Sequence, residues 1–360
     1  MKEMLSIYAG RKAYEIVKQD GLSPESVDMV VGAAGGPKWL VLGGLDRAIF
    51  FSFLRGRKKP MPLVGSSIGA WRFSALAQGE EAYNEFEKAY INQTYETRPS
   101  PGDITRESLR ILDAFLSGNS INAGLEHPWM RLCILSVYCR WPFSCENLPC
   151  LALGMTGAAI ANSLRRSLLN MFFSRAFFID SRISPPFSGM DDFAAQPVPL
   201  NGENIRHAIL ASGSIPMVMD GVRDIPGAHR GIYRDGGLID YHMDLPFDSD
   251  GIILFPHYLQ TIIPGWFDKF LPWRMPNLKN FDHVLMFCPS RDFVAGLPYE
   301  KIPTRKYFRK FWGRDDQRKG YWRQVVAQSE NLGQEFLRCI SDGSIRERIR
   351  PLSAEALARR

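Results

Sequence analysis

The stretch DMVVGAAGGPKWLVLGGLDRAIFFSF (28–53) begins with an apolar run and continues with apolar residues at the spacing of a helix. The run at 28–34 is typical of a buried strand, and Pro37 suits the first turn of a helix. The same order returns in MPLVGSSIGAWRFSALAQG (61–79), where Gly79 would end the helix. Two strand–turn–helix units in close succession predict an α/β fold, built in layers around a largely parallel sheet.

Further apolar runs continue this alternation along the chain. We expect strands at LCILSVY (132–138), RAFFID (175–180), GIILFPH (251–257) and HVLMFCP (283–289), and a helix at NGENIRHAILA (201–211). Strands that alternate with helices favour the α/β class over an all-α protein. The stretch at 184–202 is rich in Pro and Gly, which predicts a loop near the working face.

Composition narrows the class of protein. Hydrophobic residues make up 45% of the chain and charged residues 23%, which is ordinary for a folded globular protein. The N-terminal segment lacks the apolar block of a secretory signal, and no stretch offers the roughly 18 uninterrupted apolar residues of a spanning helix. The six cysteines form no CxxC pair. These features predict a cytoplasmic protein whose contact with a membrane would be peripheral.

The net charge of +6 is concentrated in one segment. Residues 299–323 contain nine Lys or Arg against three acids. Within them, RKYFRKFW (305–312) separates into two faces when wound as a helix. The basic face holds Arg305, Lys306, Arg309 and Lys310. Such a helix is typical of contact with an anionic membrane surface, although a solvated basic face over a packed aromatic one is an equally ordinary arrangement.

The pentapeptide at 65–69 is GSSIG, and it lies between an expected strand and an expected helix. A nucleophile elbow needs small residues on both sides of its serine, because the sharp turn brings the backbone and the helix close together. Gly65 and Gly69 meet that need around Ser67. The pattern GxSxG also occurs by chance in plain glycine-rich turns, so its placement carries the hypothesis that Ser67 is a nucleophile.

The first strand-to-helix turn has the sequence AAGGPKW (33–39). Unhindered amides at a helix N-terminus favour negative charge, which suits an oxyanion hole. The candidate donors are the backbone amides of Gly35, Gly36, Lys38 and Ile68. A phosphate-binding P-loop is the alternative, but its pattern ends in Gly-Lys-Ser/Thr, where this chain has Pro-Lys-Trp.

A third signal is RDGGLID (234–240), in which Gly236 and Gly237 follow Asp235. An aspartate before two glycines suits a tight loop that projects its carboxylate into a cleft. Three other acids, Asp220, Asp240 and Asp244, are rivals for the same role. A Ser-Asp-His triad would also be compatible with the order of His242, His257 and His283 along the chain, but no signature surrounds these histidines. No spacing suggests a zinc site.

The ordered set AGGPK, GSSIG and DGG resembles the patatin-like phospholipase family, whose signatures are GGGx(R/K)G, GxSxG and DG(G/A). The segment ASGSIP (211–216) resembles the family's stretch before its catalytic aspartate, so the resemblance spans residues 33–237. It implies a three-layer α/β/α patatin-like fold and a dyad without histidine. By position, Ser67 would be the nucleophile and Asp235 its base.

Two departures from the family pattern concern the oxyanion turn. Ala34 stands where the first glycine is usual, and Trp39 replaces the closing glycine. The turn is therefore expected to have a different shape. Lys38 occupies the position of the family's cation, where it would steady the turn, meet a lipid head group or simply be solvated.

The resemblance implies a lipid acyl-hydrolase that cleaves carboxylic esters of phospholipids or related acyl lipids through an acyl-enzyme, with no cofactor and no metal. The alternative is a catalytically weak or inactive patatin-like protein that binds lipid in a regulatory role. Binding of nucleic acid is not expected, because residues 299–323 match no known module. We expect a catalytic domain over 1–255, with a helical, capping segment at about 80–128, and a C-terminal extension over 256–360 packed on it.

Overall fold

The computed structural model describes residues 3–95, 98–116, 120–187, 189–190 and 192–357. The strands within these residues are β1 (Leu5–Ala9), β2 (Val27–Gly32), β3 (Met61–Ser66), β4 (Met130–Cys139), β5 (Phe173–Asp180), β6 (Ala195–Leu200), β7 (Val222–Arg223), β8 (Ile232–Asp235), β9 (Ile252–Pro256), β10 (Val284–Pro289) and β11 (Ile349–Pro351).

The α-helices of the same residues are α1 (Arg11–Asp20), α2 (Gly43–Arg47), α3 (Ile68–Gln78), α4 (Glu80–Asn92), α5 (Pro101–Phe115), α6 (Ser120–Leu125), α7 (Leu148–Leu164), α8 (Ile205–Gly213), α9 (Arg291–Ala295), α10 (Lys306–Lys310), α11 (Asp315–Ser341), α12 (Ile345–Arg348) and α13 (Ala354–Leu357). The 3-10 segments are η1 (Gly36–Leu42), η3 (Arg166–Met171), η4 (Gly236–Leu238), η5 (Trp266–Phe270), η6 (Leu278–Phe281) and η7 (Pro298–Glu300), and η2 (Ala48–Phe53) is a π-helix.

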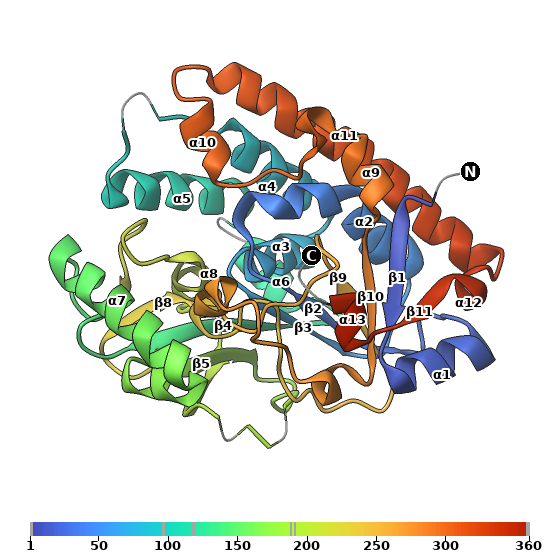
Figure 1. Cartoon of the computed structure of the whole chain (residues 1–360), viewed down its shortest axis with the longest axis horizontal. Helices are drawn as coiled ribbons and strands as arrows, with labels where there is room; N and C mark the ends of the chain where they lie inside the picture. Colours follow the sequence, from blue (N-terminus) through green and yellow to red (C-terminus); the bar gives the residue numbers. More distant parts are fainter. Residues whose placement is uncertain (1–2, 96–97, 117–119, 188, 191, 358–360) are drawn as a thin grey trace.

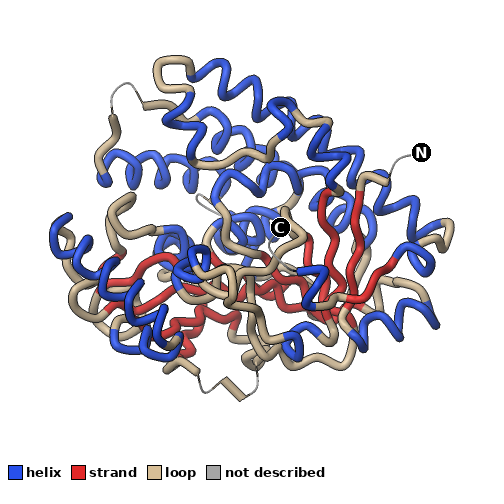
Figure 2. The backbone as a smooth tube through the Cα atoms, in the orientation of Figure 1, coloured by secondary structure: helices blue, strands red, loops and turns tan. Residues whose placement is uncertain are grey.

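One sheet contains all eleven described strands, in the order β11-β1-β10-β9-β2-β3-β4-β5-β6, with β8 beside β4 and β7 beside β8. Its centre, from β10 to β4, is parallel throughout. Helices flank the sheet on both sides, and the strands run through the middle of the molecule (Figures 1 and 2). This is a three-layer α/β/α arrangement with a largely parallel sheet, as the sequence predicts.

The strands expected in the first two units and the four later apolar runs are confirmed as β2, β3, β4, β5, β9 and β10. The helix expected after Ser67 is also confirmed: α3 ends before Gly79, which has a φ of 109°. The loop expected at 184–202 is wrong in part, because β6 lies within it. Its prolines, Pro197 and Pro199, are tolerated because β6 is the edge strand of the sheet.

The sheet continues beyond residue 255. Strand β10 pairs with β9 on one side and with the N-terminal strand β1 on the other. Helix α11 packs on α2 and η1, and it is the orange helix across the top of Figure 1. Residues 284–289 and 315–341 are therefore parts of the layered unit and not only an extension packed on its outside.

The segment at 80–128 contains α4, α5 and α6, and its residues 96–97 and 117–119 lie outside the described part of the chain. Helix α4 packs on α3 and α5. No helix among the described residues is both long and apolar enough to cross a bilayer.

Candidate active site

Ser67 occupies the turn between β3 and α3, with a φ of 54° and a ψ of −126°. A residue with a side chain rarely adopts such a φ, and a sharp strand-to-helix turn of this kind is typical of a nucleophile elbow. Packing requires the flanking glycines, since a Cβ at Gly65 would lie 2.5 Å from the Ala70 nitrogen and one at Gly69 would lie 2.1 Å from the Gly32 oxygen. The two glycines therefore allow β2, β3 and α3 to meet around Ser67.

A hydrogen bond of 2.8 Å runs from Ser67 Oγ to Asp235 Oδ2. The exposed fraction is 3% for Ser67 and 5% for Asp235. The other carboxylate oxygen, Oδ1, accepts the Gly237 N–H at 2.7 Å, which fixes the orientation of the carboxylate. The backbone N–H of Ser67 donates to Ser212 Oγ at 2.8 Å, so Ser212 supports the turn from its other side.

Strand pairing on β4 explains how this pair meets. Strand β5 occupies one edge of β4 along residues 133–139. On the opposite edge, β3 ends with Ser66 opposite Leu135, and β8 arrives antiparallel and ends with Asp235 opposite Ser136. The ends of β3 and β8 thus meet at neighbouring positions of one strand, and Asp235 comes to lie beside the residue that follows Ser66.

The two glycines after Asp235 are needed because the backbone turns there with no space for side chains. A Cβ at Gly236 would lie 2.5 Å from the Leu135 oxygen, and one at Gly237 would lie 2.8 Å from the Ala34 Cβ. The DGG signal therefore reflects packing at the sheet edge as well as the direction of the carboxylate.

Burial raises the pKa of the Asp235 carboxyl above its usual value. The Arg305 guanidinium, the hydrogen bonds from Ser67 and Gly237, and the Lys269 ammonium act in the opposite direction, in that order of size. A carboxylate with a raised pKa is a stronger base, so desolvation makes Asp235 better suited to accept a proton than an exposed aspartate.

The glycine turn at 33–36 lies beside Ser67, because β2 and β3 are parallel with Gly32 opposite Gly65. Gly36 has a φ of 56°, which glycine adopts without strain. A Cβ at Gly35 would lie 2.5 Å from the Tyr258 ring. The turn therefore has a backbone conformation and close contacts that glycine alone accommodates.

The candidate oxyanion donors line two cavities that both include Ser67. Gly36 begins η1 and Ile68 begins α3, and the first N–H groups of a helix have no partner within it. Gly36 and Ile68 line one cavity together with Ser67, whereas Gly35 and Lys38 line a second cavity that also reaches Ser67.

The two departures from the family pattern have clear structural settings. Trp39 is fully buried and its ring stacks on Phe86 of α4 at 4.7 Å between centroids, so it packs in the core. Ala34 is held on both sides, because its N–H donates to the Tyr241 carbonyl and its own carbonyl accepts from the Tyr258 hydroxyl. Neither side chain lines the cavity that contains Gly36 and Ile68.

The three histidines that a triad would need have other partners. The contacts are those of His242 with Tyr258, His257 with Leu259 and His283 with Gly251. Among the described residues, no hydrogen bond joins any of these histidines to Ser67 or Asp235. The direct contact in this site is between serine and aspartate.

Two of the three rival carboxylates are engaged elsewhere. Asp240 accepts from Arg175, and Asp244 accepts from Asn277 and Asn280, whereas Asp220 donates its backbone N–H to Thr105. No group of three or more His, Cys, Asp or Glu within the described ranges is arranged to hold a metal ion.

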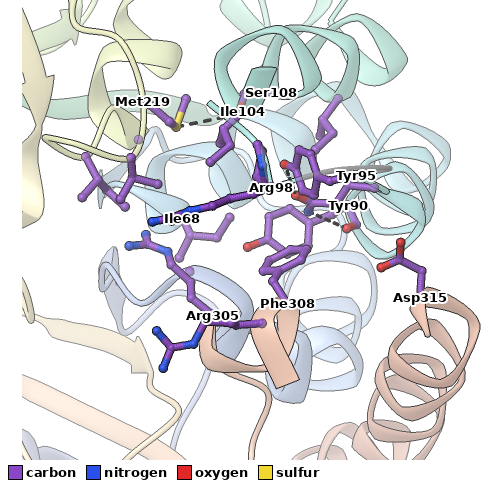
Figure 3. Close-up of a pocket in the computed structure, with 18 of the residues that line it drawn as sticks. Ile68, Tyr90, Tyr95, Arg98, Ile104, Ser108, Met219, Arg305, Phe308 and Asp315 are labelled. Atoms are coloured by element: carbon purple, nitrogen blue, oxygen red, sulfur yellow. Dashed lines mark hydrogen bonds between the residues drawn. The ribbon is translucent and has the colours of Figure 1, made fainter. Parts of the chain in front are cut away.

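An apolar cavity of about 430 Å³ opens beside Ser67. Ile68, Ile104 and Phe308, from α3, α5 and the α10 region, point into it in Figure 3, together with Arg305. A volume in this range and a mostly apolar lining are typical of small-ligand sites. The cavity can therefore accommodate an apolar group beside Ser67.

The basic helix expected at 305–312 is present as the shorter α10. Tyr307 and Phe311 are buried, and Trp312 is exposed. The four cations of the segment are exposed, yet all of them line one or both of the cavities at Ser67.

No protein-family model and no curated protein sequence matches this chain. Among solved structures, the chain is similar to human GIVD cytosolic phospholipase A2, with a TM-score of 0.35 and 10% sequence identity. The match covers 96% of this chain and 67% of that chain. At this level of similarity, the chemistry of the site has to be argued from its own residues.

Sequence reasoning named Ser67, Asp235 and the glycine turns, and the structure brings these together. The sequence analysis assigned no role to Lys269. It assigned none to Ser212 either, although this residue lies in the quoted segment ASGSIP (211–216). It assigned Arg305 to a membrane contact, whereas the guanidinium lies near the Asp235 carboxyl. No local pattern links Arg305 or Lys269 with the site, because both come from distant segments.

Proposed function

We propose that the protein is a serine acyl-hydrolase of the patatin-like phospholipase type, which cleaves carboxylic ester bonds of acyl lipids through Ser67 and Asp235. The observation that carries the proposal is the 2.8 Å hydrogen bond between Ser67 Oγ and Asp235 Oδ2 in a strained strand-to-helix turn. The ordered signatures around these residues add to it.

In the first half of the reaction, Asp235 accepts the hydroxyl proton as Ser67 Oγ attacks the ester carbonyl. The new Oγ–carbon bond forms a tetrahedral oxyanion. When that intermediate collapses, the bond to the alcohol oxygen breaks and Asp235 returns the proton to the leaving alcohol. Water then attacks the acyl-enzyme with the same aspartate as base, the Oγ–carbon bond breaks, and Asp235 returns the proton to Ser67 Oγ as the fatty acid leaves.

Backbone amides would stabilise the oxyanion. The donors we propose are the amides of Gly36 and Ile68, in the first turns of η1 and α3, together with those of Gly35 and Lys38 in the same glycine turn. The N–H of Ser67 itself is engaged by Ser212, so it is not among them. Removal of one such donor typically costs about 10²- to 10³-fold in turnover.

A lipid substrate is supported by the apolar cavity beside Ser67, which suits an acyl chain better than a polar group. The alternative is an inactive lipid-binding protein, for which Ala34 and Trp39 were the reasons. The buried position of Trp39 weakens that alternative, because its side chain packs on α4, away from the candidate donors.

We also propose that the protein works in the cytoplasm and meets anionic membranes through four exposed cations of α10 and its N-cap. These cations are Arg305, Lys306, Arg309 and Lys310. Their position around the cavities would bring the cavity mouth to the lipid surface.

The test is hydrolysis of short-chain nitrophenyl esters by the purified protein and by Ser67→Ala, together with labelling by a fluorophosphonate probe. We expect turnover and labelling of Ser67 in the wild type, and loss of both in the variant with an unchanged circular dichroism spectrum. A wild-type protein that hydrolyses no ester, or a Ser67→Ala variant that keeps most activity, would refute the proposed function.

A further inference from the structure

A second cavity of about 770 Å³ is lined by both Ser67 and Asp235. It shares Ser67, Ile215 and Arg305 with the apolar cavity, so the two meet at the candidate nucleophile. We call it the basic chamber. An ester with its carbonyl carbon at Ser67 would extend into both spaces, with its acyl part on one side and its alcohol part on the other.

The basic chamber has more charged side chains than the apolar cavity, whose lining has three arginines and one acid. Its lining contains six cations and two acids. The cations are Lys38, Lys269, Lys301, Arg305, Lys306 and Lys310, and the acids are Asp235 and Glu300. Even with both acids ionised and Lys269 mostly uncharged near neutral pH, the lining keeps an excess of positive charge beside the candidate base.

Aromatic rings hold two of these lysines inside the chamber. Lys269 Nζ lies 3.6 Å from the centre of the Tyr241 ring, and Lys38 Nζ lies 4.7 Å from that of Tyr258. The ring faces attract the ammonium groups and fix their places. The two lysines come from η5 and η1, so the tertiary structure gathers them from segments more than 200 residues apart.

The concentration of like charge is costly in the absence of an anion. Burial, with repulsion from Arg305, lowers the pKa of Lys38 to about 8. Burial, with repulsion from Lys38 and Arg305, lowers the pKa of Lys269 to about 6, although Asp235 acts in the opposite direction. A bound anion would relieve this repulsion, and charge-assisted hydrogen bonds to oxyanions are among the stronger polar contacts in proteins.

We propose that the basic chamber binds an anionic group on the alcohol side of the ester, so that the protein prefers acyl lipids with a phosphate-bearing head group to uncharged ones. This inference rests on the proposed function, since it assigns the chamber to the leaving alcohol. The alcohol takes the proton from Asp235 when the ester bond breaks, and the anionic head group then leaves through the chamber.

Binding can be measured apart from catalysis with the Ser67→Ala variant. Its affinity for dioctanoyl phosphatidylglycerol is compared with that for dioctanoylglycerol, which has the same acyl chains and no phosphate. In a third titration, the variant is titrated with dioctanoylglycerol in the presence of inorganic phosphate. We expect the phosphate-bearing lipid to bind at least about tenfold more tightly, which corresponds to about 1.4 kcal/mol. Equal affinities, or tight binding of inorganic phosphate without a preference between the lipids, would overturn the inference.

A double variant in the same background tests the residues. Lys306→Gln with Lys310→Gln removes two exposed cations of the chamber, and we expect the preference to fall several-fold. The control is Lys12→Gln with Lys58→Gln, which removes the same charge from exposed positions outside both cavities. If the preference for the phosphate-bearing lipid falls equally in the control, it depends on net charge, and the assignment of the head group to the basic chamber is wrong.

The failure of this inference and that of the proposed function are distinguishable. If the wild-type protein hydrolyses both lipids at equal kcat/KM, the acyl-hydrolase stands and the chamber assignment falls. If it hydrolyses neither, the proposed function fails, while the titrations with Ser67→Ala still decide what the chamber binds.

Discussion

Ser67 and Asp235 lie 168 positions apart in the sequence, and a hydrogen bond of 2.8 Å joins Ser67 Oγ to Asp235 Oδ2. The contact exists because β3 and β8 end at neighbouring residues of the same edge of β4. It distinguishes a dyad from a triad, in which a histidine would stand between the two side chains.

The dyad predicts the effect of Asp235→Asn. The amide cannot accept the serine proton, so we expect the rate of acyl-enzyme formation to fall by about 10²- to 10⁴-fold, the usual contribution of a general base. The matched control is His242→Gln, a buried histidine of the same region that bonds to Tyr258. A burst of nitrophenol from a short-chain ester measures acylation in both variants. Near-normal acylation in Asp235→Asn, or its collapse in a well-folded His242→Gln, would contradict the dyad.

The glycine turn predicts a loss of activity in Gly36→Ala. Alanine at a φ of 56° costs about 1–2 kcal/mol of stability, and a shift of the turn would displace an oxyanion donor. Gly56→Ala is the control, because Gly56 has a φ of 83° and open space around its Cβ position. We expect similar losses of thermal stability in the two variants and a fall of about 10²-fold in kcat for Gly36→Ala alone. Equal kcat values for Gly36→Ala and Gly56→Ala would contradict a role of the glycine turn in the oxyanion hole.

The apolar cavity predicts selectivity for chain length. Ser108 of α5 lines it, so Ser108→Leu would shorten the space for an acyl chain. We expect kcat/KM for decanoyl esters to fall several-fold relative to butanoyl esters. Ala114→Leu, an exposed substitution on the same helix, is the control. An unchanged ratio in Ser108→Leu would show that acyl chains bind elsewhere.

The pKa of Asp235 predicts the acid limb of the pH profile. Its carboxylate is the active form, so activity should fall as the pH drops through a pKa that burial holds above the usual value. The groups facing it are Ser67, Gly237, Arg305 and Lys269. Because Arg305 favours the ionised carboxylate, Arg305→Gln should raise this pKa further.

The measurement is kcat/KM for a short-chain ester against pH in the wild type, Arg305→Gln and Arg309→Gln. Arg309 lines only the apolar cavity and serves as the control. We expect the acid limb to move to higher pH in Arg305→Gln alone. A limb that stays in place would mean that Arg305 does not act on the titrating group.

The membrane proposal predicts weaker sedimentation with anionic vesicles when the four cations of the α10 segment are changed to Gln. The difference should be larger at low ionic strength, because salt screens exposed charges. Vesicles of zwitterionic lipid are the control and should bind both proteins equally. Unchanged sedimentation with anionic vesicles would contradict the proposed membrane contact of these cations.

Local patterns sufficed for much of the fold. The apolar runs of β2, β3, β4, β5, β9 and β10 have the length and composition of buried strands, and Gly79 marks the end of α3. Patterns failed where context overrides composition. The prolines of β6 suggested a loop, yet they are compatible with an edge strand, and β8 has only four residues.

The sequence by itself determined the glycines that permit the turns and the candidate serine and aspartate between them, because strained turns and close contacts restrict residue type locally. Their catalytic roles stay predictions. Only the tertiary structure decided that Ser67 and Asp235 touch, since this depends on which strands share an edge of β4. It also decided that Arg305, Lys38 and Lys269 surround them. These cations come from three distant segments, and no periodicity along a chain records a proximity that sheet order and helix packing create.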